Sequence, residues 1–205
     1  MVLQCFKDWD NNQDLSLKKI TIKLAMLLAL SSASRCSELA HLDVNKMKYL
    51  PNGAKFQLVN HKKNKKAKCL PGEIFFPSIP AEPKLCPVSC LSTYIARTKS
   101  HRNKDSDLFR SFIKPFGKVT PTTVSRWLTQ VIILAGGPVL KKKLKGHSVR
   151  GAATSVALDK GLSIKDIIKA GDWKQDSVFF KHYYHPSDIE KFGKTVLSVK
   201  QMAEN

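Results

Sequence analysis

The sequence predicts a mainly α-helical fold with a small antiparallel β element (α+β). Apolar residues recur at helical spacing in several segments, most of which begin at a capping residue or proline and end at glycine. Two short strand-like segments each follow a turn sequence, Pro51-Asn52-Gly53 and Pro71-Gly72. The 205 residues, of which 42% are hydrophobic, match the usual size of one domain with one core. We therefore expect residues 1–205 to form a single domain.

The first predicted helix spans residues 15–30, with Asp14 as its capping residue and leucines recurring on one face. Its apolar run, residues 24–30, is much shorter than the roughly 20 residues needed to span a bilayer, so it is interpreted as a core helix. No secretory signal pattern opens the chain, which indicates an intracellular protein. Arg35 lies at the end of this helix or just beyond it.

The predicted strands cover residues 54–59 and 73–77, and a lysine-rich segment connects them. From Pro87 onward the pattern is helical. The predicted helices span residues 87–98, 121–135, 147–160 and 163–171, followed by one that starts near Asp176 and one over 187–201. The last helix is expected to pack on a neighbouring copy of the chain.

The charge balance predicts a polyanionic partner. Lys and Arg total 35 against 16 Asp and Glu, which gives a net charge of +19. That excess is far larger than solubility alone requires. DNA, RNA and an anionic membrane would each satisfy it, so the partner cannot be chosen from charge alone.

The five cysteines form an odd and scattered set, unlike the disulfide framework of a small secreted domain. Cys86 and Cys90 have a spacing that invites a zinc interpretation, but no second Cys or His pair stands at matching spacing. Buried thiols and no metal site are therefore expected. The cysteines are Cys5, Cys36, Cys69, Cys86 and Cys90.

Residues spread over the chain can together cut a phosphodiester without a metal ion. Two guanidiniums, Arg35 and Arg150, can stabilise the charge that the pentacoordinate transition state concentrates on the nonbridging oxygens. A tyrosine can attack if its phenol, with a free pKa of about 10, has an electropositive site and a proton acceptor. His147 is the candidate acceptor, since on a helix it shares a face with Arg150.

Four segments stand in a telling order along the chain: residues 34–39 (SRCSEL), residues 146–154 (GHSVRGAAT), residues 171–173 (GDW) and Tyr183. In this order they resemble the catalytic domain of the tyrosine recombinase (phage integrase) family, especially the crypton-like and DIRS-like mobile elements of eukaryotes. The match covers nearly the whole chain. Either arginine motif alone is weak, and the order of all of them makes chance agreement improbable.

The resemblance implies roles for these residues. Arg35 and Arg150 would hold the scissile phosphate, and His147 would take the tyrosine proton or hydrogen-bond the phosphate. Trp173 stands where many relatives have histidine, and its indole N–H can donate to phosphate although it cannot act as a base. Glu38 would orient Arg35 or the local backbone. The structural alternatives are a surface arginine for Arg35 and a core tryptophan for Trp173.

The nucleophile and the general acid each have alternatives. Tyr183 is the predicted nucleophile and Tyr184 is the alternative. Adjacent side chains on a helix point about 100° apart, so only one of the two can face the phosphate. The family protonates the leaving 5′-hydroxyl from a hairpin lysine, for which we choose Lys63, with Lys62 and Lys65 as alternatives. The lysines expected to contact DNA phosphates are Lys62, Lys65, Lys66, Lys141, Lys142 and Lys143.

By resemblance, the chain is expected to recombine or integrate double-stranded DNA in the nucleus through a 3′-phosphotyrosyl intermediate. No cofactor, metal, membrane or small-molecule substrate is implied, and a homotetramer on DNA is expected. Relatives carry a separate N-terminal core-binding domain, which we do not expect in this chain. The alternatives are a type IB topoisomerase and a catalytically silent DNA-binding domain of a domesticated or decayed element. A protein that binds RNA or a membrane surface would leave the ordered Arg, His, Arg, Trp and Tyr set unexplained.

Overall fold

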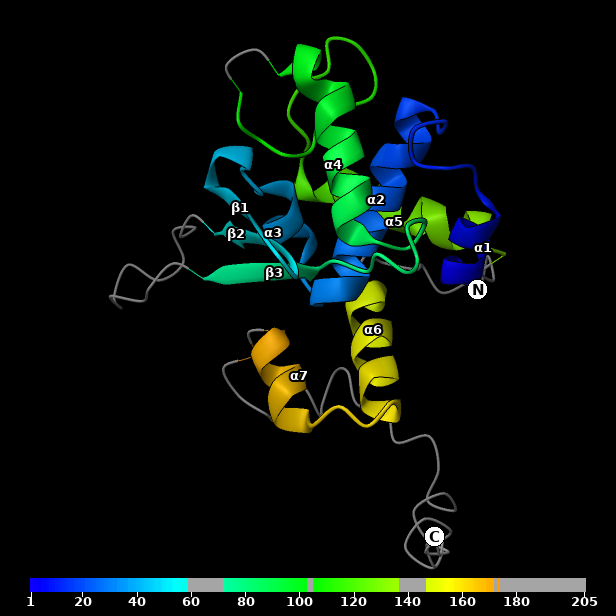
Figure 1. The fold of residues 1–205 in the computed structure, drawn as a ribbon, viewed down its shortest axis with the longest axis vertical. Coiled ribbons are helices and arrows are strands. Elements are labelled where there is room, and N and C mark those ends of the chain that lie inside the picture. The colour runs from blue at the N-terminus through cyan, green and yellow to red at the C-terminus, as the bar shows by residue number, and fades with distance from the viewer. Residues whose placement is uncertain (59–71, 103–104, 137–146, 172, 174–205) are drawn as a thin grey trace, which may run out of the picture.

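The computed structural model describes residues 1–58, 72–102, 105–136, 147–171 and 173 of the chain (Figure 1). In this part, helices form most of the molecule and a three-stranded antiparallel sheet lies at one side. The predicted fold class is therefore confirmed. No helix of the described part is long and apolar enough to cross a membrane. The elements are α1 (Val2–Asp8), α2 (Leu17–Ser32), α3 (Cys36–Ala40), η1 (Val44–Lys46), β1 (Met47–Leu50), β2 (Gly53–Gln57), β3 (Glu73–Pro77), α4 (Pro87–Thr98), η2 (Lys99–His101), α5 (Pro121–Leu134), α6 (His147–Asp159) and α7 (Ile164–Ala170).

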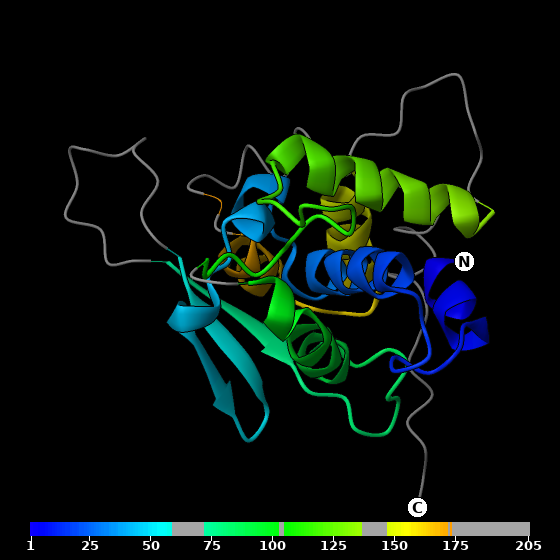
Figure 2. The same ribbon diagram turned by 90° about the horizontal axis from the view of Figure 1, so that it is seen from above.

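Helix α2 is the centre of the fold. It lies between α4 and α5, and it also packs against α3, α6 and β3 (Figure 2). An unbroken run from Ile20 to Ala29 is buried, so this helix has no solvent-facing side over most of its length. Its start differs from the prediction, because Ser16 rather than Asp14 caps it. The Ser16 hydroxyl accepts the backbone N–H of Lys19 at 3.2 Å.

The buried run of α2 includes a lysine. Lys23 is fully buried, and its Nζ donates a hydrogen bond to Oδ1 of Asn12 at 2.9 Å. The same Nζ lies 5.8 Å from the centre of the Phe6 ring. Burial lowers the pKa of Lys23, since water no longer stabilises the ammonium charge. This contact ties the segment before α2 to the core.

The sheet has the order β1-β2-β3, and β1 was not predicted from the sequence. Ala54, Phe56 and Phe76 are fully buried on its inner face, where the rings of Phe56 and Phe76 meet edge to face at 5.7 Å. The start of β2 requires glycine, because a Cβ on Gly53 would lie 2.3 Å from the Phe76 carbonyl oxygen. The strands therefore present one apolar face to α2 and the other face to solvent.

The helices predicted after the sheet agree closely with the structure. Helix α4 has the predicted bounds, α5 and α6 each end one residue early, and α7 begins after the capping residue Ser163. Helix α1 was not predicted. The proposed helices beginning near Asp176 and at residue 187 lie outside the described residues.

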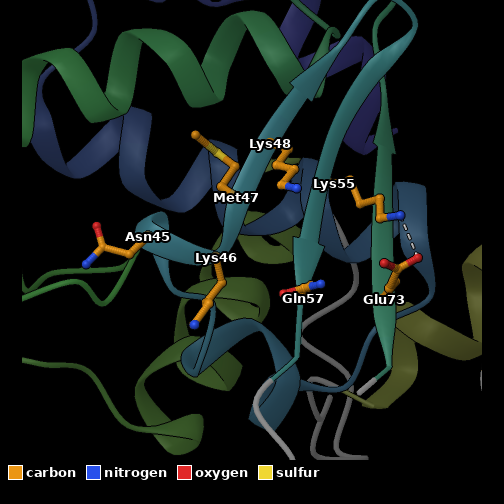
Figure 3. A pocket seen from close by; sticks show the side chains of 7 residues that line it. All are labelled: Asn45, Lys46, Met47, Lys48, Lys55, Gln57 and Glu73. Atoms are coloured by element: carbon orange, nitrogen blue, oxygen red, sulfur yellow. Dashed lines mark ion pairs between the residues drawn. The ribbon is translucent and has the colours of Figure 1, made fainter. Parts of the chain in front are cut away.

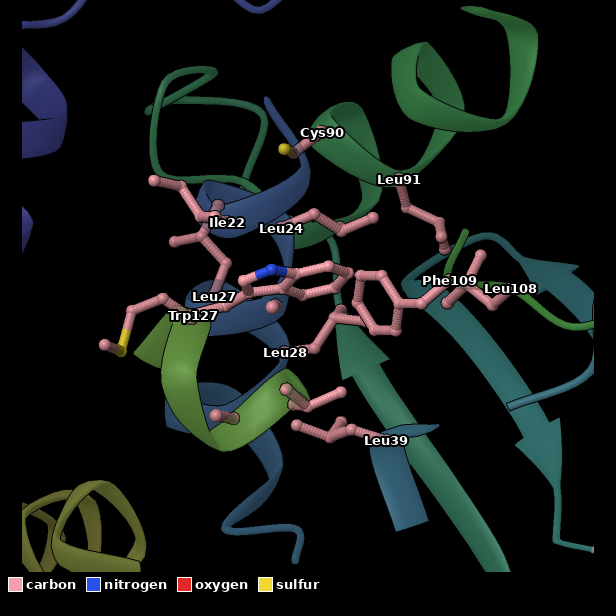
Figure 4. Packing of buried hydrophobic residues seen from close by; sticks show 14 of the residues in the cluster. Ile22, Leu24, Leu27, Leu28, Leu39, Cys90, Leu91, Leu108, Phe109 and Trp127 are labelled. Atoms are coloured by element: carbon pink, nitrogen blue, oxygen red, sulfur yellow. The ribbon is translucent and has the colours of Figure 1, made fainter. Parts of the chain in front are cut away.

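Trp127 on α5 fills the space between the central helix and the segment that precedes α5. Its ring lies among Leu24, Leu28 and Phe109 (Figure 4), and the centres of the Trp127 and Phe109 rings are 5.8 Å apart. Only 5% of Trp127 is exposed. Its large apolar surface makes it a main contributor to the packing of α5 on α2.

Replacing Trp127 with alanine is expected to lower the free energy of unfolding by about 3–5 kcal/mol, because it leaves a large cavity in a closely packed core. Denaturant unfolding followed by circular dichroism measures this loss. Ile133→Ala is the matched control, since Ile133 lies on the same helix and is 46% exposed. Equal losses for the two variants would contradict the central position of Trp127.

Candidate active site

Helix α6 carries the second predicted arginine into the interior of the molecule. It begins at His147 and packs against α2 and α7. Val149 belongs to the main hydrophobic core and thus fixes the first turn of α6 against it. Arg150, the next residue, is only 2% exposed. A guanidinium so deeply buried needs partners from neighbouring segments.

Trp173 and Gly171 supply such partners to Arg150. The guanidinium carbon of Arg150 lies 4.0 Å from the centre of the Trp173 ring, a cation–π contact. Its Nη2 also donates a hydrogen bond to the carbonyl oxygen of Gly171. The structure thus brings together two residues that the sequence predicts at one phosphate-binding site, although 23 positions separate Arg150 from Trp173.

The end of α7 fixes the position of the tryptophan. The N–H of Gly171 donates to the carbonyl of Ile167 at 3.0 Å, and the N–H of Trp173 donates to that of Ile168 at 3.2 Å. Ile167 and Trp173 form a small hydrophobic cluster of their own, against which Ala157 and Leu158 of α6 pack. Helices α6 and α7 therefore hold Arg150 and Trp173 as one unit.

Glycine is required at position 171 because the Trp173 ring approaches its backbone closely. Its φ angle of −86° is one that any residue adopts, so the backbone conformation alone does not reveal this requirement. A Cβ at this position would lie 1.8 Å from an atom of the Trp173 ring, with two further ring atoms within 2.4 Å. The ring therefore lies directly over the Gly171 Cα. Sequence reasoning interpreted Gly171 as a helix stop and missed this packing role. The signal available was its spacing of two residues from Trp173.

Arg35 lies in the turn between α2 and α3. Helix α2 ends at Ser32 and is capped by Ala33, whose φ of 50° is left-handed and ends the helical path of the chain. Arg35 is the N-cap of α3, and both its backbone and its side chain bind Glu38. The backbone N–H donates to Oε2 of Glu38 at 2.6 Å, and Nη1 donates to Oε1 at 2.5 Å. Glu38 thus orients both the Arg35 side chain and its backbone.

The arginine remains accessible despite this pairing, since 39% of its side chain is exposed against 20% for Glu38. Arg35 lies just after the end of α2. Helix α6, which carries Arg150, packs against the same helix. The next residue, Cys36, is buried. Burial raises the pKa of the Cys36 thiol, so it adds no negative charge beside Arg35 at neutral pH.

Two of the four tyrosines are described, and neither suits nucleophilic attack. The Tyr94 hydroxyl is deep in the core and accepts the backbone N–H of Arg110 at 3.0 Å. Tyr49 is on β1. Burial raises the pKa of both phenols, the opposite of activation. Tyr183 and Tyr184 are the two that remain.

Much of the predicted site lies outside the described residues. This holds for the nucleophile candidates Tyr183 and Tyr184 and for every lysine proposed as general acid or DNA contact. For His147, the structure gives its position at the start of α6. The lysines concerned are Lys62, Lys63, Lys65, Lys66, Lys141, Lys142 and Lys143.

Of the four described cysteines, Cys36, Cys86 and Cys90 are buried as predicted and Cys5 is half-buried, while Cys69 lies outside the described residues. Cys86 caps α4, where its sulfur accepts the backbone N–H groups of Ile79 at 3.2 Å and Ser89 at 3.4 Å. Cys90 is fully buried, and burial raises its pKa to about 12. Among the described residues, no three His, Cys, Asp or Glu side chains gather where they could hold a metal ion.

The family model described as the phage integrase family matches residues 8–190. The chain belongs to the phage integrase family. Its fold is similar to that of the XerA recombinase, with a TM-score of 0.63 and 18% identity over 89% of this chain and 64% of XerA. No curated protein sequence matches it.

Two further family structures were solved with DNA. The XerH site-specific recombinase bound to its difH substrate matches with a TM-score of 0.66 and 12% identity, over 97% of this chain and 52% of XerH. The FLP recombinase in complex with a Holliday junction matches with a TM-score of 0.52 and 17% identity, over 90% of this chain and 45% of FLP. At such identities the likeness establishes the fold, and this chain spans between 45% and 64% of the three recombinases.

Replacing Gly171 with alanine is expected to destabilise the α6–α7 unit by about 1–3 kcal/mol, because the new methyl group must displace the Trp173 ring. Hydrogen exchange of the α7 amides measures this as a loss of protection. Gly117→Ala is the control, since a Cβ at Gly117 would meet nothing within 4 Å. Unchanged α7 protection in the Gly171 variant would contradict the close approach.

Proposed function

We propose that this chain cleaves and rejoins double-stranded DNA in site-specific recombination, through a 3′-phosphotyrosyl intermediate. One observation carries the proposal. In a member of the phage integrase family, the guanidinium carbon of Arg150, in the His147-x-x-Arg150 motif, lies 4.0 Å from the centre of the Trp173 ring. A guanidinium held over an aromatic ring keeps its planar set of donors in place, which suits binding to the oxygens of a phosphate.

The first chemical step transfers a DNA strand to the enzyme. The Tyr183 oxygen attacks the scissile phosphorus, its proton passes to His147, and the bond from phosphorus to the 5′ oxygen breaks. Arg35 and Arg150 stabilise the additional negative charge on the nonbridging oxygens, and Trp173 donates its indole N–H. Lys63 gives its proton to the departing 5′ oxygen, which leaves as a hydroxyl. The DNA is then joined to Tyr183 through its 3′ phosphate.

The second step reverses the first with a different strand. A 5′-hydroxyl attacks the phosphotyrosyl phosphorus and loses its proton to Lys63, while Tyr183 departs and regains a proton from His147. Each step exchanges one phosphodiester for another, so the bond energy is kept. The chemistry therefore needs no nucleotide hydrolysis.

The partners proposed are duplex DNA and three further copies of the chain. The charge of +19 supports a nucleic-acid partner. The related XerH and FLP recombinases are described in complex with a difH substrate and a Holliday junction, and a junction has four arms. The crypton-like or DIRS-like resemblance of the sequence leads us to propose a mobile-element origin and a nuclear location.

Capture of covalent protein–DNA adducts under denaturing conditions, followed by mass spectrometry of the linked peptide, tests the reaction. We expect an adduct at Tyr183 that is absent from Tyr183→Phe and present in Tyr184→Phe, because phenylalanine lacks the attacking oxygen. The reverse pattern would assign the nucleophile to Tyr184. Salt-sensitive DNA binding without any adduct would indicate a silent DNA-binding domain. Relaxation of any supercoiled plasmid would indicate a type IB topoisomerase.

Glu38 is a positioning residue for the proposed reaction. One carboxylate oxygen fixes the backbone at Arg35 and the other fixes its guanidinium, at 2.6 and 2.5 Å. Charge-assisted hydrogen bonds of this kind are shorter and stronger than neutral ones. Loss of either bond lets the guanidinium move away from the phosphate, and a displacement of about 1 Å can cost about 100-fold in rate.

Glu38→Gln is therefore expected to slow adduct formation by about 10- to 100-fold while DNA affinity is kept or increased, because the change removes a negative charge. Single-turnover rates and binding constants measured separately check this split. Glu82→Gln is the control, since it removes the same charge from a surface pair with Lys7. A parallel loss of affinity and rate would refute a positioning role.

A further inference from the structure

The outer face of the sheet carries a cluster of lysines that the proposed reaction does not use. In the antiparallel register, Lys48 lies directly opposite Lys55, and Lys55 lies opposite Phe75. Next to this row lies a cavity of about 220 Å³ (Figure 3). Its lining includes Lys46, Lys48, Lys55, Gln57 and Glu73. We call these five residues the sheet-face cluster.

The arrangement is electrostatically unfavourable for the protein alone. Like charges directly opposite each other on two strands are destabilising. Glu73 offsets part of this repulsion through an ion pair with Lys55, whose Nζ and Oε2 atoms are 2.7 Å apart. Three lysines and one glutamate still leave the cluster with an excess of positive charge. An anion bound at this face would relieve the remaining repulsion.

We propose that the sheet-face cluster binds the sugar–phosphate backbone of duplex DNA, away from the phosphate that the arginines hold. This inference rests on the proposed function. Lysine is a flexible point charge that neutralises phosphate without reading the sequence of bases. The cluster thus adds sequence-independent affinity and fixes how the duplex lies across the domain.

An acidic peptide is the rival occupant, and two observations favour DNA. The whole chain has a charge of +19, as expected of a protein that neutralises many phosphates. In addition, Gln57 ends β2 and Glu73 begins β3, so the cluster adjoins both ends of the connecting segment that contains Lys62, Lys63 and Lys65. The lysines of the sheet therefore extend a basic region that the sequence already assigns to DNA.

The salt dependence of binding to a duplex of random sequence tests the proposal. Each phosphate contact contributes about 0.9 to the slope of log affinity against log salt. The combined variant Lys46→Gln, Lys48→Gln and Lys55→Gln is expected to reduce the slope by about 2 to 3. Circular dichroism and thermal unfolding verify that the variant is folded.

The matched control removes three exposed lysines elsewhere: Lys18→Gln, Lys99→Gln and Lys114→Gln. Lys18 lies in the first turn of α2, at the end opposite Arg35, and Lys99 directly follows α4. Arg97 of α4 bonds the Leu15 carbonyl at 2.5 Å, so these two helix ends are neighbours. We expect the control to keep the slope of the unaltered protein. Equal slopes for the unaltered protein, the combined sheet-face variant and this control would overturn the proposal.

Glu73→Gln supplies a test that misfolding cannot mimic. The change removes the only negative charge of the sheet-face cluster and frees Lys55, so DNA should bind several-fold tighter. Unchanged or weaker DNA binding by this variant would overturn the proposal. Polyglutamate serves as the probe for the rival acidic peptide. If the combined lysine variant loses polyglutamate binding but keeps the DNA slope, the proposal is also overturned. The adduct experiment is independent: a slope change without any adduct would support this face and refute the proposed chemistry.

Discussion

Burial of α2 on every side is the constraint on which the rest of the structure depends. Because residues from Ile20 to Ala29 have no solvent-facing side, α4, α5, β3 and α6 must each contribute an apolar surface to cover them. That requirement sets where each element lies. It also places Arg35 at the end of the central helix, and it places the start of α6 against the same helix. The two arginines that we propose as catalytic therefore lie on segments that the packing around α2 fixes in place.

The proposed site combines two different ways of holding an arginine. Arg35 is partly exposed and is oriented by a carboxylate, which keeps the guanidinium charged and in place but neutralises part of its field. Arg150 is buried and is oriented by an aromatic ring and a backbone carbonyl, neither of which carries a formal charge. Neither of these two contacts neutralises the positive charge of Arg150. In a low-dielectric setting such a charge acts more strongly on a phosphate than it would in water.

Local signals predicted those parts of the fold that local chemistry determines. Proline at the start of α4 and serine at the cap of α7 gave correct helix starts. At α2 the prediction named Asp14, but the cap is Ser16, and local sequence does not separate two residues that are both good caps. Strand β1 was missed because its four residues are defined by pairing with β2, and α1 because Phe6 is its only buried residue. The same limit applies to the site. The pattern His147-x-x-Arg150 indicated a shared helix, but the stacking of Arg150 on Trp173 is a tertiary contact that no spacing encodes.

The separate cluster of Ile167 and Trp173 has a consequence for how activity depends on stability. Among the described residues, few buried apolar side chains hold α7 to α6, while the main core is far larger. Segments with few apolar contacts open at lower free energy than the global unfolding of the domain. Heat or denaturant will therefore release Trp173 from Arg150 while the sheet and the central helices are still intact. Loss of the proposed phosphate site is then expected to precede loss of the fold, so that inactivation would be a local event.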